Sequence, residues 1–190
     1  MYLTYKEKSK EGAFYTPQWA AQKAAQRLLH VFPSEFGWKF YDPAAGEGSL
    51  LGALMSTAPK ADAEGTTLRE EDVLICQNKG IKCSKFDFLN GNFDNLPQSI
   101  TTAAQQGRLV MFMNPPFEAN KVCAFMERAW KLGAIGMGLF SKMDIYKGQS
   151  LQGFREKHKL RMNIVSTPFI TISTAFGCKG KWPVIFSVML

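Results

Sequence analysis

An unbroken apolar segment that ends at two prolines is the feature that most limits how this chain can fold. Residues 109–113 carry only bulky apolar side chains, which is typical of a strand buried on both faces of a parallel sheet. Pro115 and Pro116 end the strand and stiffen the turn after it. We therefore predict a rigid loop that presents the Asn114 amide, backbone carbonyls and the Phe117 ring to a planar group bearing an NH₂. A purely structural Pro-Pro turn is the alternative.

Strand-like and helical segments alternate along the chain, which predicts an α/β fold built from right-handed βαβ units in a doubly wound sheet. Strands are expected at residues 36–41, 63–68, 81–86, 108–113, 135–140, 162–173 and 183–190. Helices are expected at residues 17–31, 49–56, 70–78, 97–106, 120–132 and 148–158. The pattern predicts a mostly parallel seven-stranded sheet with an antiparallel hairpin at one edge. We expect one domain over residues 1–190, with residues 1–12 mobile.

The composition is that of an ordinary globular protein, with 46% hydrophobic and 21% charged residues. No apolar run reaches the length of a membrane span, and the N-terminus lacks the apolar core of a signal peptide. The cysteines show no C-x-x-C spacing and the two histidines are far apart, so we expect reduced thiols, no metal site and a cytoplasmic protein. The cysteines are Cys76, Cys83, Cys123 and Cys178.

The net charge of +7 is concentrated near the C-terminus. Residues 141–190 contain eight basic residues against two acidic ones, an excess of six positive charges. A localised basic region suits a polyanion such as nucleic acid. The alternative is a basic surface that serves solubility alone.

The segment after the first predicted strand, Asp-Pro-Ala-Ala-Gly-Glu-Gly at residues 42–48, has the composition of a ligand-binding loop. Glycine and alanine let a ligand approach the backbone, and the following helix offers free N–H groups. The spacing is neither that of a dinucleotide fold nor that of a P-loop. Its acidic residues suit an ammonium group, such as that in the methionine part of S-adenosylmethionine. A plain strand-to-helix turn is the alternative.

Four motifs in this order resemble those of the N6-adenine-specific DNA methyltransferases. They are Gly-Ala-Phe-Tyr-Thr-Pro at 12–17, the glycine loop at 42–48, Asp-Phe-Leu at 87–89 and Asn-Pro-Pro-Phe at 114–117. The resemblance covers about residues 12–190. It implies a Rossmann-like fold, S-adenosylmethionine as cofactor, adenine in DNA as acceptor, and a place in restriction-modification.

The resemblance also implies roles for single residues. The methionine half of the cofactor is assigned to Tyr15, Thr16, Pro17, Asp42, Ala44 and Gly46. Asp87 is expected to receive the amino group of the cofactor's adenine, with Phe88 packed nearby. Two structural alternatives stay open: Thr16 and Pro17 also suit the N-cap and first position of a helix, and Asp87 also suits the cap of a turn.

The sequence departs from the family pattern in two places. An acid usually ends the second strand and binds the ribose hydroxyls, whereas Thr67 stands at the matching position; weaker cofactor binding is expected, or replacement by a neighbouring acid. These neighbours are Asp62, Glu64, Glu70 and Glu71. A target-recognition domain is also missing after residue 188. We therefore expect a bare catalytic domain, a fragment, or a subunit whose partner recognises the DNA sequence.

The implied chemistry needs neither a metal nor a covalent nucleophile. Hydrogen bonds from adenine N6 to the Asn114 oxygen and the Pro115 carbonyl would localise its lone pair, while Phe117 stacks on the base. Phe176, with Phe169 in reserve, is the candidate for a second aromatic against a flipped-out adenine. Both rings also suit ordinary core packing.

The acceptor itself is less constrained than the chemistry. Lys157, Lys159 and Arg161 are expected to line the rim of the acceptor cleft and bind phosphates. The same catalytic loop also serves methyltransferases of RNA adenine and of protein glutamine, and a non-catalytic nucleic-acid-binding subunit could keep the fold. The implied setting is the cytoplasm of a prokaryotic or phage-infected cell.

Overall fold

The computed structural model describes residues 16–159, 161–165, 169–172 and 183–190 of the chain. The predicted site residues Tyr15 and Phe176 lie outside these ranges, as does the segment 1–12 that was expected to be mobile. No helix among the described residues is long and apolar enough to cross a membrane.

The described elements follow one another largely in the predicted order. The strands are β1 (Lys39–Asp42), β2 (Asp62–Thr67), β3 (Lys82–Lys85), β4 (Leu109–Met113), β5 (Gly136–Lys142), β6 (Phe169–Ile172) and β7 (Pro183–Met189). The α-helices are α2 (Gln18–Val31), α3 (Ser49–Thr57), α4 (Glu70–Asn78), α5 (Gln98–Gln105), α6 (Ala119–Leu132), α7 (Asp144–Lys147) and α8 (Gln152–His158). Short 3₁₀ turns are η1 (Ser34–Phe36), η2 (Phe93–Asn95) and η3 (Gln149–Leu151).

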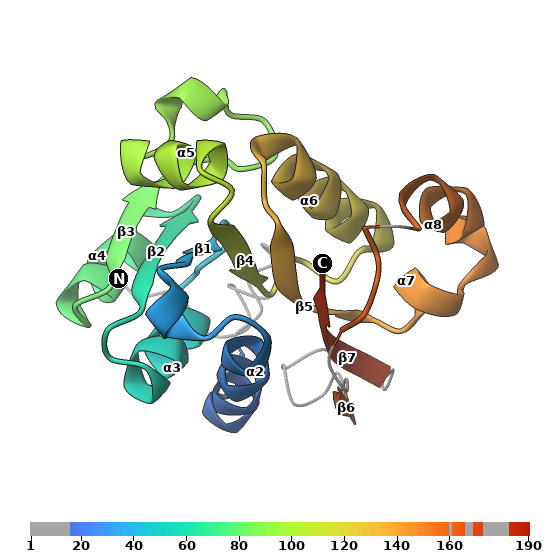
Figure 1. Cartoon of the computed structure of the whole chain (residues 1–190), viewed down its shortest axis with the longest axis horizontal. Helices are drawn as coiled ribbons and strands as arrows, with labels where there is room; N and C mark the ends of the chain where they lie inside the picture. The colour runs from blue at the N-terminus through green and yellow to red at the C-terminus, as the bar shows by residue number, and fades with distance from the viewer. Residues whose placement is uncertain (1–15, 160, 166–168, 173–182) are drawn as a thin grey trace.

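The strands form one twisted sheet in the order β3-β2-β1-β4-β5-β7-β6 (Figure 1). Strands β3, β2, β1, β4 and β5 pair in parallel, while β7 runs antiparallel to β5 and to β6. This arrangement confirms the predicted α/β fold, its mostly parallel sheet and its antiparallel edge pair. The strand order reverses between β1 and β4, and ligands of such sheets bind at the carboxyl ends of the strands at this switch point.

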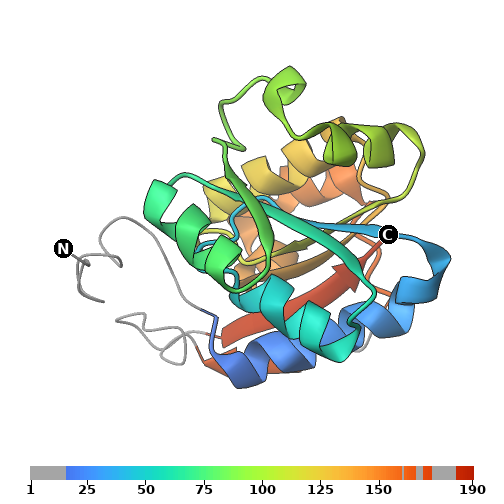
Figure 2. The same cartoon turned by 90° about the vertical axis from the view of Figure 1, so that its left-hand side faces the viewer.

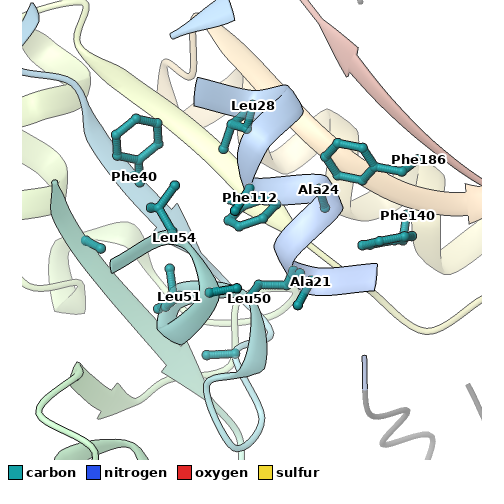
Figure 3. Packing of buried hydrophobic residues seen from close by; sticks show 14 of the residues in the cluster. Ala21, Ala24, Leu28, Phe40, Leu50, Leu51, Leu54, Phe112, Phe140 and Phe186 are labelled. Atoms are coloured by element: carbon teal, nitrogen blue, oxygen red, sulfur yellow. The ribbon is translucent and has the colours of Figure 1, made fainter. Parts of the chain in front are cut away.

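Helices cover both faces of the sheet (Figure 2). On one face, α2 and α3 pack against the strands through small and branched side chains, and Figure 3 shows these meeting the phenylalanines of β1, β4, β5 and β7. On the other face, α5 and α6 pack against a second cluster that contains Tyr41, Phe88 and Trp130. All five residues of β4 are apolar and buried, as expected of a strand between two helical layers.

Two local predictions were wrong. Thr16 is not the N-cap of the first helix: Pro17 takes that position, and its backbone carbonyl accepts the N–H groups of Ala20 and Ala21. The helix expected at residues 148–158 is divided into η3 and α8, with α7 preceding them. Gly148 has an extended backbone that ends α7, and Arg155 from α8 donates a 2.7 Å hydrogen bond to its carbonyl.

Candidate active site

A cavity of about 440 Å³ opens at the carboxyl ends of β1, β2, β3 and β4, a size ordinary for small-molecule sites. It brings together most of the residues that the sequence singled out. Those that line it are Thr16, Asp42, Ala44, Gly46, Thr67, Asp87, Phe88, Asn114 and Pro116. Pro17 does not line it.

The glycine loop after β1 is folded tightly over the neighbouring strand β2. Gly46 and Gly48 have positive φ angles of 51° and 79°, which side chains with a Cβ rarely adopt. The Ala45 N–H donates a 2.9 Å hydrogen bond to the Thr66 carbonyl of β2. Gly65 makes this approach possible, because a Cβ there would lie 2.7 Å from the Cβ of Ala45. The fold of this loop therefore depends on Gly65 in the neighbouring strand as well as on its own Gly46 and Gly48.

Asp42 ends β1 as a buried carboxylate on the cavity wall, with only 2% of the residue exposed. Burial raises its pKa to about 7, although a hydrogen bond from the Ala44 N–H acts in the opposite direction. A buried carboxylate is stabilised by a cation placed beside it. The cavity therefore offers a place for an ammonium group at this end.

The end of β2 contributes Thr67, as expected, but no acid from that strand replaces it. Asp62 and Glu64 are instead bound to the buried Lys39 ammonium at 2.8 and 2.7 Å. Among the acids near the end of β2, Asp72 in the first turn of α4 lines the cavity, and its carboxylate lies 3.7 Å from the Arg69 Nε. The sequence analysis named Glu70 and Glu71 at the start of α4 but not their neighbours Arg69 and Asp72, which line the cavity.

Asp87 organises the loop that follows β3. Its carboxylate accepts hydrogen bonds from the Leu89 and Asn90 N–H groups and from the Asn90 side chain. Partial burial raises the pKa of Asp87, but these hydrogen bonds and the nearby Arg128 charge outweigh it and hold the pKa below its ordinary value. A carboxylate has about four lone-pair positions, so one remains for a ligand in the cavity.

A cation on α6 supports the same loop from outside. Arg128 donates a 2.6 Å hydrogen bond to the Gly91 carbonyl, and its guanidinium lies 4.2 Å from the centre of the Phe93 ring. Phe88, the residue after Asp87, stacks on Phe125 of α6 with ring centroids 5.5 Å apart. The loop that carries Asp87 is thus fixed by the core and by α6.

Asn114 follows β4 and is 9% exposed, with its side chain on the cavity wall. Its Nδ2 donates a 2.9 Å hydrogen bond to the Thr16 Oγ1. Its Oδ1 is buried and has no hydrogen-bond partner among the described residues. Buried polar atoms are nearly always hydrogen-bonded, so an acceptor without a partner on a residue of the cavity wall suits a ligand that carries a donor.

Two residues of the Asn-Pro-Pro-Phe loop, Pro115 and Phe117, do not line the cavity. Phe117 is only 3% exposed and belongs to the core cluster beneath α2 and α3, and it does not line the cavity. Stacking of this ring on a base would require it to leave the core. Pro115 is buried and also lies off the cavity wall. Its predicted catalytic role stays a prediction.

None of Lys157, Lys159 and Arg161 lines this cavity, and their expected place on the rim of the acceptor cleft stays a prediction. Lys157 forms a 3.0 Å ion pair with Glu127 of α6, and the Arg161 guanidinium lies 5.9 Å from the centre of the Trp130 ring. Glu127 and Trp130 lie in the second half of α6, whereas the first residues of α6 come directly after the Asn-Pro-Pro-Phe loop. Lys159 is exposed.

Lys121 and Phe125 of α6 line the cavity instead, and sequence reasoning missed both. Lys121 lies in the first turn of α6 and pairs with Glu118 at 3.0 Å. The helical spacing of Lys121 and Phe125, four residues apart and just after the Pro-Pro loop, could have indicated that both face the cavity. Phe169, the reserve aromatic, lies on the edge strand β6 opposite Phe186 of β7.

Within the described ranges, no group of three or more His, Cys, Asp or Glu side chains is placed to hold a metal ion.

One curated protein is similar in sequence, while no family model matches. The modification methylase CviBIII of Paramecium bursaria Chlorella virus NC1A is 29% identical over 47% of this chain. The matched region makes up 27% of the viral protein, so the chain corresponds to about a quarter of that relative.

Solved structures resemble nearly the whole chain. The methyltransferase subunit of a type I restriction-modification system from Streptococcus thermophilus matches with a TM-score of 0.68 and 15% identity, over 93% of this chain and 44% of that one. A putative RNA methyltransferase from Pyrococcus horikoshii matches with a TM-score of 0.65 and 16% identity, over 93% and 85%. The N-terminal domain of human METTL16, solved in complex with SAH, matches with a TM-score of 0.59 and 14% identity, over 93% and 72%. The chain therefore has the fold that these methyltransferase structures share.

Proposed function

We propose that the protein transfers a methyl group from S-adenosylmethionine to the N6 amino group of adenine in DNA. The observation that carries this proposal is the buried Oδ1 of Asn114, a residue of the cavity wall, which has no hydrogen-bond partner among the described residues. Leaving a buried acceptor without a partner costs about 1–3 kcal/mol. An acceptor molecule with an amino group at this position removes that cost, whereas one without N–H or O–H groups does not.

The residues of the cavity fit the proposed cofactor. The buried Asp42 carboxylate suits the ammonium group of its methionine part, and the positive φ of Gly46 lets the backbone approach it closely. Leu68 and Phe88 offer apolar contacts for its adenine, and the remaining lone-pair position of Asp87 suits the adenine amino group. When bound, S-adenosylmethionine supplies a methyl group on a positively charged sulfur.

Asn114 then acts on the acceptor and not on the cofactor. Its Oδ1 accepts one hydrogen from the amine and so orients the nitrogen lone pair toward the methyl group. The same oxygen stabilises the positive charge that develops on the nitrogen, which is a preorganised electrostatic effect. The stiff Pro-Pro segment keeps the Asn114 side chain in this position. Such positioning matters because holding two reactants in line supplies much of the rate enhancement. The Pro115 carbonyl is proposed as the acceptor of the second hydrogen.

The similar proteins favour DNA as the acceptor, because the sequence relative is a modification methylase and a structural neighbour belongs to a restriction-modification system. An adenine in a duplex would have to be flipped out to reach the cavity. Lys121 at the cavity wall offers a cation for a flanking phosphate. We also propose that a separate subunit recognises the DNA sequence, since the neighbour is itself one subunit of a larger system. RNA adenine is the second candidate, favoured by the putative RNA methyltransferase among the neighbours.

One experiment separates these possibilities. The protein and its Asn114→Ala variant are incubated with methyl-labelled S-adenosylmethionine and with DNA, RNA and protein pools, and labelled nucleosides are identified by mass spectrometry. We expect N6-methyladenine in DNA and almost none with the variant. Label in RNA alone would select the second candidate. If the protein binds S-adenosylhomocysteine, the demethylated cofactor, but no pool takes up label, the proposed enzymatic activity would be contradicted. A non-catalytic subunit would then be favoured.

A further inference from the structure

We infer that Thr16 is a positioning residue that sets which end of the Asn114 amide faces the acceptor; this inference rests on the proposed function. The two side chains are 98 residues apart in sequence and form a buried hydrogen bond of 2.9 Å. Thr16 is 7% exposed and lines the same cavity wall. The contact therefore joins the start of α2 to the end of β4 at the reacting position.

Both partners are residues that precede a proline, which limits their backbone to extended conformations. Thr16 is followed by Pro17, whose carbonyl accepts the N–H groups of Ala20 and Ala21 and so ties this segment to α2. Asn114 is followed by Pro115 and Pro116 after the buried strand β4. Neither side chain can move far without moving a packed element, so the hydrogen bond is made between two rigid supports.

The orientation matters because the two ends of an amide have opposite hydrogen-bonding character. The oxygen accepts and the nitrogen donates. With Nδ2 bonded to Thr16, the oxygen is left for the acceptor amine. An amide turned by 180° would set N–H donors against the N–H donors of an amine, and it would stabilise no developing positive charge. The Thr16 hydroxyl can also donate, so it selects this orientation when its own hydrogen is given to another acceptor, such as the bound cofactor, and its oxygen can then only accept from Nδ2.

Thr16 can do this while also contacting the cofactor, since a hydroxyl accepts and donates at once. The two roles are separable by experiment. A role in cofactor binding changes the affinity for S-adenosylhomocysteine. A role in orienting Asn114 changes the turnover number and leaves that affinity nearly unchanged.

The test compares Thr16→Val, which keeps the shape and removes the hydroxyl, with Thr16→Ser, which keeps the hydroxyl. We expect kcat to fall about tenfold in Thr16→Val, the order expected for one buried hydrogen bond, and to stay within about twofold in Thr16→Ser. The dissociation constant of S-adenosylhomocysteine, measured by calorimetry, should change less than about threefold in both. Equal kcat in the two variants, or loss of cofactor affinity matching the loss of kcat, would overturn the inference.

A second readout does not depend on methyl transfer or on the stability of a variant. The side-chain amide of Asn114 is assigned in the nitrogen-15 spectrum of the wild-type protein by its disappearance in Asn114→Ala. Its hydrogens should exchange with water more slowly than those of the exposed Asn78. Exchange as fast as that of Asn78 would overturn the hydrogen bond itself. Protected hydrogens in a protein that methylates no acceptor would uphold the contact and contradict only the proposed function.

Discussion

The loops on the two sides of the switch point differ in how completely their polar groups are bonded within the protein. On the side proposed for the cofactor, the carboxylates of Asp42 and Asp87 each accept N–H groups from residues two or three positions further along the chain. On the side proposed for the acceptor, the buried Asn114 oxygen has no hydrogen-bond partner in the described part of the chain, and its nitrogen is bonded to a residue 98 positions away. One side is built by local contacts and the other by contacts between distant segments.

Because of this difference, the two halves of the site should be sensitive to different substitutions. The cofactor loops depend on backbone conformations and close approaches that glycine permits. The proposed acceptor side depends on side chains whose partners come from other parts of the chain, such as Asn114 with Thr16. Changes in the first half should therefore affect binding, and changes in the second half should affect turnover or acceptor affinity.

The largest expected effect comes from Asn114→Ala. Removing one preorganised polar group at a reacting centre typically lowers kcat by about 10²–10³. The affinity for S-adenosylhomocysteine should change less than about twofold, because this side chain acts on the acceptor. Steady-state kinetics and calorimetry on the same preparation check both values, with Asn78→Ala on the exposed end of α4 as the control. Equal losses of turnover and of cofactor affinity would place Asn114 on the cofactor side.

Gly65→Ala is expected to weaken cofactor binding and to leave the proposed acceptor half of the site unchanged. A Cβ at this position would lie 2.7 Å from Ala45 and 2.9 Å from Leu51, so the glycine loop must move. Overpacking of this kind costs about 1–3 kcal/mol of stability, and we expect about tenfold weaker binding of S-adenosylhomocysteine from displacement of the loop.

The matched control for that change is Gly153→Ala in α8, where nothing lies within 4 Å of the added Cβ. This substitution should raise the stability by about 0.5–1 kcal/mol, because alanine is the better helix former. Thermal unfolding and calorimetry measure both effects. Unchanged cofactor affinity in Gly65→Ala would show that the loop does not hold the cofactor.

The affinity for the cofactor product should depend on pH through Asp42. Burial raises the pKa of this carboxyl to about 7 in the free protein, and a ligand ammonium binds the ionised form. Below pH 7 binding must therefore release a proton, and above pH 7 it need not. We expect affinity to rise about tenfold from pH 6 to pH 8 and to level off above pH 7. Calorimetry on Asp42→Asn should show a flat profile; the same pH dependence in that variant would assign it to another group.

The smallest expected effect is a difference in DNA binding between variants of two lysines, Lys121 and Lys157. Lys121→Gln removes a cation from the cavity wall, whereas Lys157→Gln removes one that is paired with Glu127 on the face of α6. We expect Lys121→Gln to weaken DNA binding roughly threefold at low salt and Lys157→Gln to change it less, as single surface charges contribute little. Fluorescence anisotropy over a salt series measures this. The reverse order would place the path of the DNA over α8.

The sequence predicts the lining of the cavity better on the side proposed for the cofactor than on the side proposed for the acceptor, for a physical reason. Asp42, Gly46 and Asp87 lie in turns of a few residues, and these turns follow from residue types that are adjacent in the chain. The burial of Phe117 depends on α2 and α3, and the position of Lys157 depends on α6. No local pattern encodes such packing between elements. Asp72 was missed for the same reason, because α4 brings it to the cavity from outside the strand register.

The most direct test of the central claim is a crystal structure of the protein with S-adenosylhomocysteine. We predict the ligand in the cavity, with its ammonium group at Asp42, its adenine beside Leu68 and Phe88, and its sulfur on the side lined by Asn114. Asn114 Nδ2 should still be bonded to Thr16, with Oδ1 open toward the acceptor. A ligand bound elsewhere, or one whose sulfur faces away from Asn114, would contradict the account.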